Sequence, residues 1–101
     1  IQAMVADCHI DLHASRLMSL DCARRMDEGL PVKTESAMTK VFVSEALGRI
    51  ADRAAQMCGA LGMSEDDSAV ALIVRELRPF RIYDGASELH RATLGRRFLK
   101  T

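Results

Sequence analysis

The chain has 101 residues, which is the length of a single domain. Its 14 Lys and Arg side chains balance 14 Asp and Glu side chains, and a net charge of zero argues against nucleic acid or an anionic membrane as a partner attracted by bulk charge. No apolar run approaches the roughly 20 residues that span a bilayer, and no signal-peptide pattern opens the chain.

The first quarter of the chain has the periodicity of one long helix. Ile10 and Leu17 lie opposite its main apolar stripe, so this helix is sandwiched between neighbours or lies at a subunit contact. Gly29 is suited to the position after the last helical turn, and a proline follows two residues later, so the helix should end near Glu28. The main stripe comprises Ile1, Met4, Val5, Cys8, Leu12, Ser15, Ser19, Cys22, Ala23 and Met26.

A second long helix is predicted to start after Thr34, as its N-cap, and to run to about Cys58. Small side chains along it would let other backbones come close. Two helices of about 25 residues each, joined by a short loop, predict an antiparallel hairpin. The apolar stripe of the second helix comprises Val43, Leu47, Ile50, Ala54 and Met57, and the small residues are Ala46, Gly48, Ala51, Ala54 and Ala55.

The remaining residues predict two shorter helices. Ser64 and Asp67 have the spacing of a capping box, and the helix after them should stop before Pro79. Several residues in this stretch are also compatible with a strand, but the acidic cap favours a helix. "PFRIYDG" is a connector, and "ASELHRATLGRRFLK" is a final helix whose basic C-terminal end suits the helix dipole.

These elements predict one all-α domain over residues 1–101. We expect an up-and-down helical bundle, with two long antiparallel helices and two shorter ones, that forms an incomplete four-helix bundle.

Histidines and cysteines give no convincing metal or nucleophilic site. His9 and His13 are four apart and share a helix face, but no third ligand is evident and "HIDLH" is not the HExxH pattern. Two histidines that face solvent or a partner are the default interpretation. The three cysteines, at positions 8, 22 and 58, have no CxxC spacing, which predicts small buried residues and a reducing compartment, the cytoplasm.

Two stretches could carry function, and each has a plain alternative. "QMCGALG" spans Gln56 to Gly62, and it is either a helix C-cap with a turn or a place where the polar chain of a ligand approaches the backbone. In "RPFRIYDGASELHR", Asp84 stands before Gly85 at the entrance of the final helix. It is either a helix cap or a general base that apolar neighbours would have to desolvate.

The order of these stretches resembles the C-terminal helical domain of the acyl-CoA dehydrogenases. That domain has Gln-x-x-Gly-(Gly)-x-Gly at a helix end, about two dozen further residues, then Ile-Tyr-(Glu/Asp)-Gly-x-Ser-Glu and a final basic helix. "ADCHIDLHASRLM" and "AMTKVFVSEALGRIADRAAQ" are similar to the two preceding helices of the family. The resemblance covers essentially the whole chain.

The resemblance implies a flavoenzyme that oxidises the α,β bond of an acyl-CoA thioester. It assigns the base that removes the α-proton to Asp84, with hydride transfer to N5 of FAD. It also implies an electron-transfer flavoprotein as acceptor and a homo-oligomer, a dimer or tetramer. Contacts to the adenosine-diphosphate half of an FAD held mainly by a neighbouring subunit fall on Gln56, Met57, Cys58, Gly59 and Ala60. The residues expected near FAD after the base are Ala86, Ser87 and Glu88.

The chain also departs from the family pattern. Asp84 is one methylene shorter than the usual Glu, Ala60 replaces the second glycine, and Ala86 stands where many relatives have Thr. The family's N-terminal helical domain, its central β domain and the first long helix of the C-terminal domain have no counterpart in these residues. We therefore expect part of a larger enzyme that is inactive by itself. The alternative is a catalytically inactive helical interaction or oligomerisation module of the same fold.

Overall fold

The computed structural model describes residues 1–64, 66 and 69–100, and every regular element among them is helical. The all-α fold is therefore confirmed, including a helix rather than a strand in the third element. The four helices are α1 (Gln2–Asp27), α2 (Lys33–Cys58), α3 (Ala69–Leu77) and α4 (Ser87–Leu99). Two short 3-10 helices connect them, η1 (Gly59–Met63) and η2 (Arg78–Arg81).

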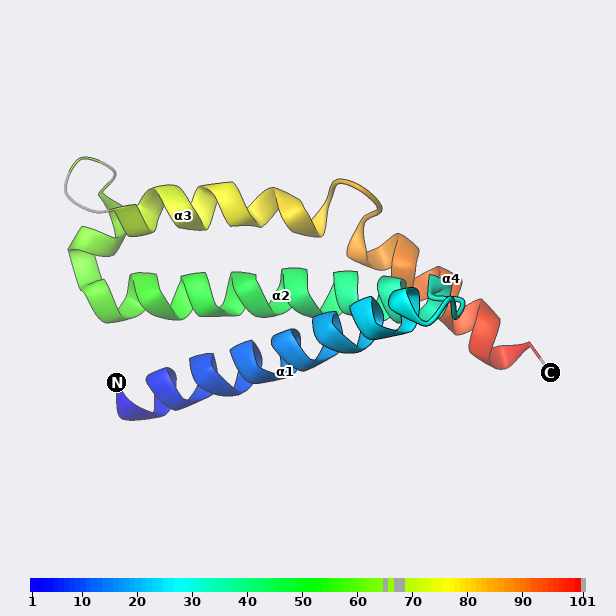
Figure 1. Ribbon diagram of the computed structural model, residues 1–101. Helices are drawn as coiled ribbons and strands as arrows, with labels where there is room; N and C mark the ends of the chain where they lie inside the picture. Colours follow the sequence, from blue (N-terminus) through cyan, green and yellow to red (C-terminus); the bar gives the residue numbers. More distant parts are fainter. Residues whose placement is uncertain (65, 67–68, 101) are drawn as a thin grey trace.

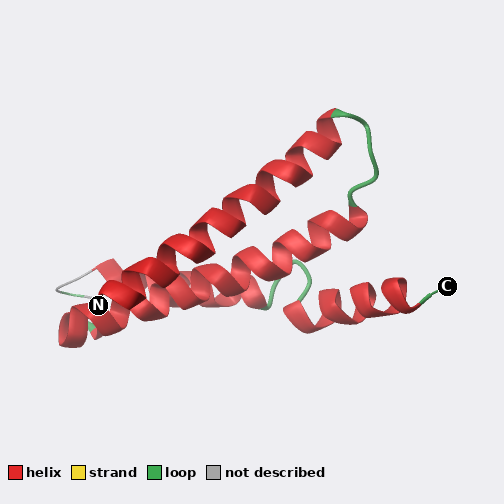
Figure 2. Ribbon diagram, turned by 90° about the horizontal axis from the view of Figure 1, so that it is seen from below, coloured by secondary structure: helices red, strands yellow, loops and turns green. Residues whose placement is uncertain are grey.

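Helix α2 is the central element of an elongated molecule that measures 50 × 23 × 23 Å. Helices α1 and α3 lie on either side of it, so the first three helices run up, down and up (Figure 1). Helix α4 packs on the first half of α2 and then leads away from the bundle rather than returning along it (Figure 2). No helix in the described part of the chain is both long and apolar enough to cross a membrane.

The end of α1 has the geometry that the sequence predicts. Gly29 has φ +73°, and its N–H donates to the carbonyl of Met26 at 3.0 Å. The N–H of Leu30 donates to the carbonyl of Arg25 at 2.9 Å. These two bonds form a Schellman motif, which satisfies carbonyls that the helix itself leaves unpaired and turns the chain toward α2.

The start of α2 differs from the prediction. The helix begins at Lys33 with Val32 as N-cap, and no side chain caps it. Thr34 therefore lies inside the first turn, where its hydroxyl accepts a hydrogen bond from Arg97 of α4. The predicted capping box of the third helix cannot be compared, because Asp67 lies outside the described residues.

The interior is built from small side chains. Among the described residues, the buried apolar side chains are all alanines: Ala37, Ala46, Ala51 and Ala71. Many large apolar residues are exposed, among them Ile10 at 65% and Leu17 at 54%, on the face of α1 opposite its main stripe. Apolar side chains are therefore present on two sides of the first helix, and in the described structure both sides keep exposed members, such as Ile10 opposite the stripe and Met26 on it.

Gly62 shows how closely the backbones approach. Its position in η1 lies against α2, and a Cβ added there would come within 2.4 Å of the carbonyl oxygen of Ala55. Because that neighbour is backbone, it cannot move aside as a flexible side chain could. Gly62 is thus required by packing, which explains the second glycine of "QMCGALG" without a ligand.

An ion-pair cluster joins α1 to α2. The carboxylate of Asp11 accepts hydrogen bonds from Nε and Nη2 of Arg49 at 3.1 and 2.9 Å, and from Nη1 of Arg53 at 2.7 Å. Asp11 is buried, whereas the Arg49 side chain is 44% exposed and lies over the ring of Phe42. The hydrogen bonds from Arg49 outweigh the effect of burial and, with those from Arg53, lower the pKa of Asp11 to about 2.

Replacement of Gly62 by Ala should destabilise the protein by about 1–3 kcal/mol, because the added methyl group collides with the α2 backbone. Thermal unfolding followed by circular dichroism measures the effect. Gly95→Ala is the matched control, since Gly95 lies within α4 with no atom near its missing Cβ. That change should stabilise the protein by about 0.5–1 kcal/mol. Equal stability of the Gly62 variant and the wild type would contradict the packing explanation.

Asp11→Asn should destabilise the protein by about 2 kcal/mol at pH 7, because it removes the charge that both arginines bind. The pKa of Asp11 is depressed from 3.8 to about 2, so its contribution is complete above about pH 5 and is lost as the pH falls through 2.

Urea unfolding at pH 7 and pH 2.5 tests this dependence. The difference between the two proteins should be much smaller at pH 2.5 than at pH 7. The control is Asp7→Asn, one turn earlier on α1, where the side chain is exposed. A difference between Asp11→Asn and wild type that stays constant across this pH range would contradict the role of the charge.

Candidate functional site

Lys40 of α2 holds the connector between η2 and α4. Its ammonium group donates hydrogen bonds to the carbonyl of Phe80 and, at 3.0 Å, to the carbonyl of Gly85. These two carbonyls lie on either side of residues 82–84. Lys40 therefore closes the connector into a loop and fixes it against the central helix.

Glu45 makes a second attachment for the same loop. Its Oε1 accepts a hydrogen bond from the hydroxyl of Ser87 at 2.8 Å, and its Oε2 lies 2.8 Å from Nε of Arg81. Burial acts to raise the pKa of Glu45, but the Ser87 hydrogen bond and the Arg81 guanidinium outweigh it, so the pKa lies below its usual value. Glu45 is therefore held as a carboxylate.

Asp84 lies in this loop with an exposed carboxylate. Its φ of +54° is in the left-handed region, which is uncommon for a residue other than glycine. Its carbonyl accepts a hydrogen bond of 3.3 Å from the His90 ring, assigned here to the Nε2–H tautomer. That ring covers Gly85, where a Cβ would come within 2.4 Å of Nε2. Position 85 therefore requires glycine for two reasons: a Cβ would collide with the His90 ring, and a φ of +90° favours glycine.

The structure bears on both interpretations of Asp84. The capping interpretation is wrong, because Ala86 is the N-cap of α4 and no side chain caps that helix. For the base interpretation, the flanking Ile82 and Tyr83 remain 61% and 45% exposed. Within the described part of the chain, Asp84 is open to solvent. Its role as a base stays a prediction.

The second predicted group lies where α2 ends. Gln56, Cys58, Gly59 and Ala60 are exposed, and Met57 is half-buried. The expectation that all three cysteines are small buried residues is wrong for Cys58, while the other two are half-buried. Gly59 has φ +63° and ψ −136°, a conformation open to glycine alone, so the C-cap interpretation is correct.

The same end of α2 also has room for a ligand. A hollow of about 310 Å³ lies there. One exposed amide, small side chains and an accessible backbone suit an elongated polar chain such as the adenosine-diphosphate part of FAD. The amide and the accessible backbone suit that half of the cofactor, whereas the carboxylate of Asp52 in the same lining does not favour its phosphates. The hollow is lined by Asp52, Ala55, Gln56, Gly59, Ala60 and Met63.

The two predicted groups do not meet within one chain. The loop with Asp84 is attached at Lys40, whereas the other group begins at Gln56, about 24 Å farther along α2 at 1.5 Å per residue. Of the three residues expected to follow the base, Ala86 is half-buried and Glu88 is exposed, while Ser87 is 1% exposed and bound to Glu45. Ser87 as a whole is therefore closed to a cofactor in this packing, backbone included.

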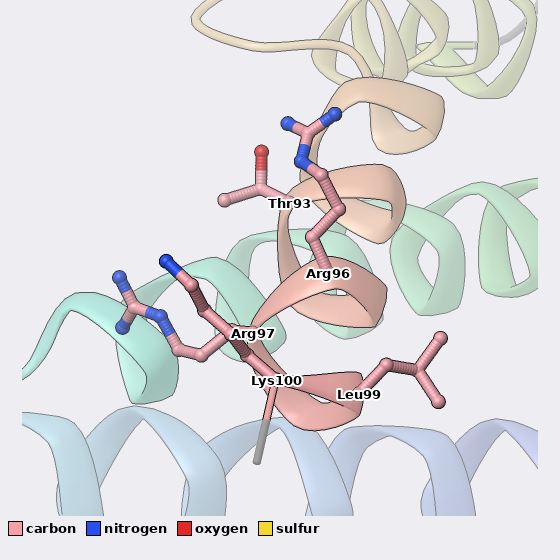
Figure 3. A pocket seen from close by; sticks show the side chains of 5 residues that line it. All are labelled: Thr93, Arg96, Arg97, Leu99 and Lys100. Atoms are coloured by element: carbon pink, nitrogen blue, oxygen red, sulfur yellow. The ribbon is translucent and has the colours of Figure 1, made fainter.

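Other candidates are less informative. His9 and His13 are exposed on α1, and no group of three or more potential metal ligands lies together within the described ranges. A hollow of about 600 Å³ on α4 is lined by residues from the end of that helix alone, where Arg97 and Lys100 extend to one side and Leu99 to the other (Figure 3). None of the predicted site residues borders it.

Sequence reasoning missed the residues that organise the loop. Lys40, Glu45 and His90 act on backbone carbonyls or on side chains that are up to 45 residues away in the sequence. No local pattern identifies such partners. The only available signal was the position of Lys40 and Glu45 on the helix that was expected to be central.

Comparison with known proteins assigns the fold to a family. Residues 1–99 match the family described as "Acyl-CoA dehydrogenase, C-terminal domain". Over 100 residues the chain is 35% identical to the (R)-benzylsuccinyl-CoA dehydrogenase of Thauera aromatica. This match covers 98% of the present chain and 24% of that protein. It is 33% identical over 101 residues to the mitochondrial short-chain specific acyl-CoA dehydrogenase of Rattus norvegicus, with 100% and 24% covered.

Solved structures give the same result. A chain in the structure reported as "Electron transferring flavoprotein of Acidaminococcus fermentans: Towards a mechanism of flavin-based electron bifurcation" superposes with a TM-score of 0.92 at 27% identity, covering 99% of this chain and 26% of that one. The structure reported as "FAD complex of PigA" has a TM-score of 0.87 at 23% identity, covers 96% and 25%, and supports the fold alone. The chain spans about a quarter of the length of these relatives, and it belongs to the acyl-CoA dehydrogenase family through the C-terminal helical domain.

Proposed function

We propose that this chain is part of an FAD-dependent acyl-CoA dehydrogenase and that Asp84 is its general base. The observation that carries the proposal is an exposed carboxylate in a loop that two side chains of α2 hold in place, within a domain of this family. The activity would belong to a larger assembly, because the chain spans about a quarter of its relatives.

Asp84 would remove the α-proton of an acyl-CoA thioester. That proton is weakly acidic, so the carboxylate must lie within hydrogen-bond reach of it and away from bulk water. Ile82 and Tyr83 beside it are apolar surfaces that could help to exclude water once another surface covers them. FAD, when bound, would take the β-hydrogen as hydride, and an electron-transfer flavoprotein would be the subsequent acceptor.

The glycine segment at the end of α2 would serve a cofactor held mainly by another subunit. Gln56 offers an amide donor and acceptor, and Gly59 and Ala60 leave the backbone accessible. Its separation from Asp84 along α2 supports contributions to two different active sites, which requires a homo-oligomer, a dimer or tetramer. A cytoplasmic location stays a prediction.

The second candidate is an inactive interaction module of the same fold. The exposed apolar side chains of α1 favour it, because they need a partner whether or not the assembly is catalytic. The short side chain of Asp84 also reaches less far than that of Glu. The two candidates differ in one measurable respect, which is whether acyl-CoA reduces the flavin of the assembly.

Asp84→Asn should slow the bleaching of the flavin by acyl-CoA by on the order of 10²–10⁴-fold, with FAD still bound, because the amide cannot accept the proton. Stopped-flow absorbance of the flavin under anaerobic conditions measures the rate, and the FAD-to-protein ratio serves as the second readout. Glu76→Gln, an exposed carboxylate on α3, is the matched control and should bleach at the wild-type rate. Bleaching by Asp84→Asn at that same rate would remove Asp84 from the mechanism. Absence of bleaching in the wild type would favour the inactive module.

Gln56→Ala should weaken FAD binding by roughly tenfold, because it removes one hydrogen-bonding group from the proposed cofactor contact. Gln56 is exposed, so its loss should leave the fold intact. Isothermal titration of the apoprotein with FAD measures the affinity, and Gln2→Ala at the exposed start of α1 is the control. Unchanged affinity in Gln56→Ala would contradict the assignment of this segment.

A further inference from the structure

We propose that Lys40 and Glu45 are positioning residues that form a clamp on the Asp84 loop and set where its carboxylate stands. The inference rests on the proposed function of Asp84. Each of the two residues binds one group before the loop and one group after it. Neither needs to touch the reacting atoms.

Lys40 closes the loop through backbone groups. Its ammonium has three N–H donors, and two of them bind the carbonyls of Phe80 and Gly85. Because a cation contacts both carbonyls, these hydrogen bonds are of the stronger, charge-assisted kind. The two ends of the loop cannot separate unless at least one of these bonds breaks.

Glu45 closes the loop through side chains. It lies five residues after Lys40 on α2, and its carboxylate takes Arg81 before the loop and Ser87 after it. The Glu45 side chain is only 16% exposed and Ser87 is 1% exposed, so water competes little for these groups. The two attachments use opposite charges. The cationic Lys40 donates to carbonyl oxygens, whereas the anionic Glu45 binds a hydroxyl and a guanidinium.

The conformation of the loop explains why a clamp is needed. Asp84 and Gly85 both have positive φ, at +54° and +90°. A residue other than glycine keeps such a conformation only where its surroundings hold it there. Asp84 also has a shorter side chain than Glu, so the backbone must do more to place the carboxylate. A misplacement of about 1 Å can slow a reaction by roughly 10²-fold.

The experiment uses the full protein that contains this chain, purified with bound FAD. Lys40→Met keeps most of the length of the side chain and removes the ammonium. Lys40→Arg keeps the charge and the donors. Lys33→Met is the matched control, because Lys33 is an exposed lysine on the same helix.

Hydrogen exchange provides a readout that does not depend on activity. The amides of Ile82 and Tyr83 donate to the carbonyl of Pro79, so they report opening of the loop. In Lys40→Met they should exchange roughly tenfold faster, since a charge-assisted contact is lost. The amides of Gly29 and Leu30, at the end of α1, should be unchanged. Lys40→Arg should restore most of the protection, and Lys33→Met should behave as wild type.

Flavin bleaching by saturating acyl-CoA gives the second readout. Lys40→Met should lower the rate constant by roughly tenfold to 100-fold, with the FAD content and the half-saturating acyl-CoA concentration unchanged. A merely structural role would alter those two quantities as well. Lys40→Arg should recover most of the rate.

The outcomes separate the two proposals. Wild-type exchange in Lys40→Met overturns the clamp, and faster exchange with an unchanged bleaching rate overturns its positioning role. Faster exchange in Lys40→Met, together with wild-type bleaching in Asp84→Asn, would instead reject Asp84 as the base. If Lys40→Met does not fold, Glu45→Gln takes its place. Its amide still accepts from Ser87 but loses the ion pair with Arg81, and the same readouts decide.

Discussion

The structure depends on how closely other segments can approach α2. Ala46 is completely buried and Ala51 is 5% exposed, so neighbouring backbones pack against a surface of small side chains. The contact of Gly62 with the Ala55 carbonyl is the extreme case, because there the two backbones touch. Small side chains permit this arrangement but bury little apolar area, and the hydrophobic contribution to stability within the chain is correspondingly small.

Charged side chains on α2 then determine where the surrounding segments lie. Glu45, Arg49 and Arg53 are spaced four residues apart and so share one side of the helix. Glu45 binds the loop that contains Asp84, whereas the two arginines bind Asp11 of α1. The hydrogen bonds to Asp11 are the main cause of the raised pKa of Arg49, and the nearby charge of Glu45 adds to it. The residues of α2 that hold α1 and the residue that holds the loop are therefore close enough for their charges to interact.

The sequence predicted those features that depend on local chemistry. Apolar periodicity predicted the helices. Gly29 predicted the end of α1, because the left-handed residue that follows the last turn of a helix is usually glycine. Thr34 is not the N-cap because the helix already begins at Lys33. Its hydroxyl instead accepts from Arg97, 63 positions away, and a local pattern carries no information about that partner. The order of two motifs identifies the candidate residues, while the contacts of Lys40 and Glu45 that hold the Asp84 loop are tertiary. The small core could be anticipated from the alanines of α2, but the burial of Asp11 between two arginines could not.

Under the proposed function, the exposure of Asp84 fits a chain that supplies one wall of a catalytic site. A base of this kind needs a dry environment, and the flanking Ile82 and Tyr83 lie open. The chain also has a radius of gyration of 16.0 Å, against about 13 Å for a compact domain of this length. It leaves large apolar surfaces on α1 uncovered, and its relatives are about four times longer. Under the proposed function, a larger assembly would cover the exposed side chains of α1 and would also enclose the carboxylate of Asp84.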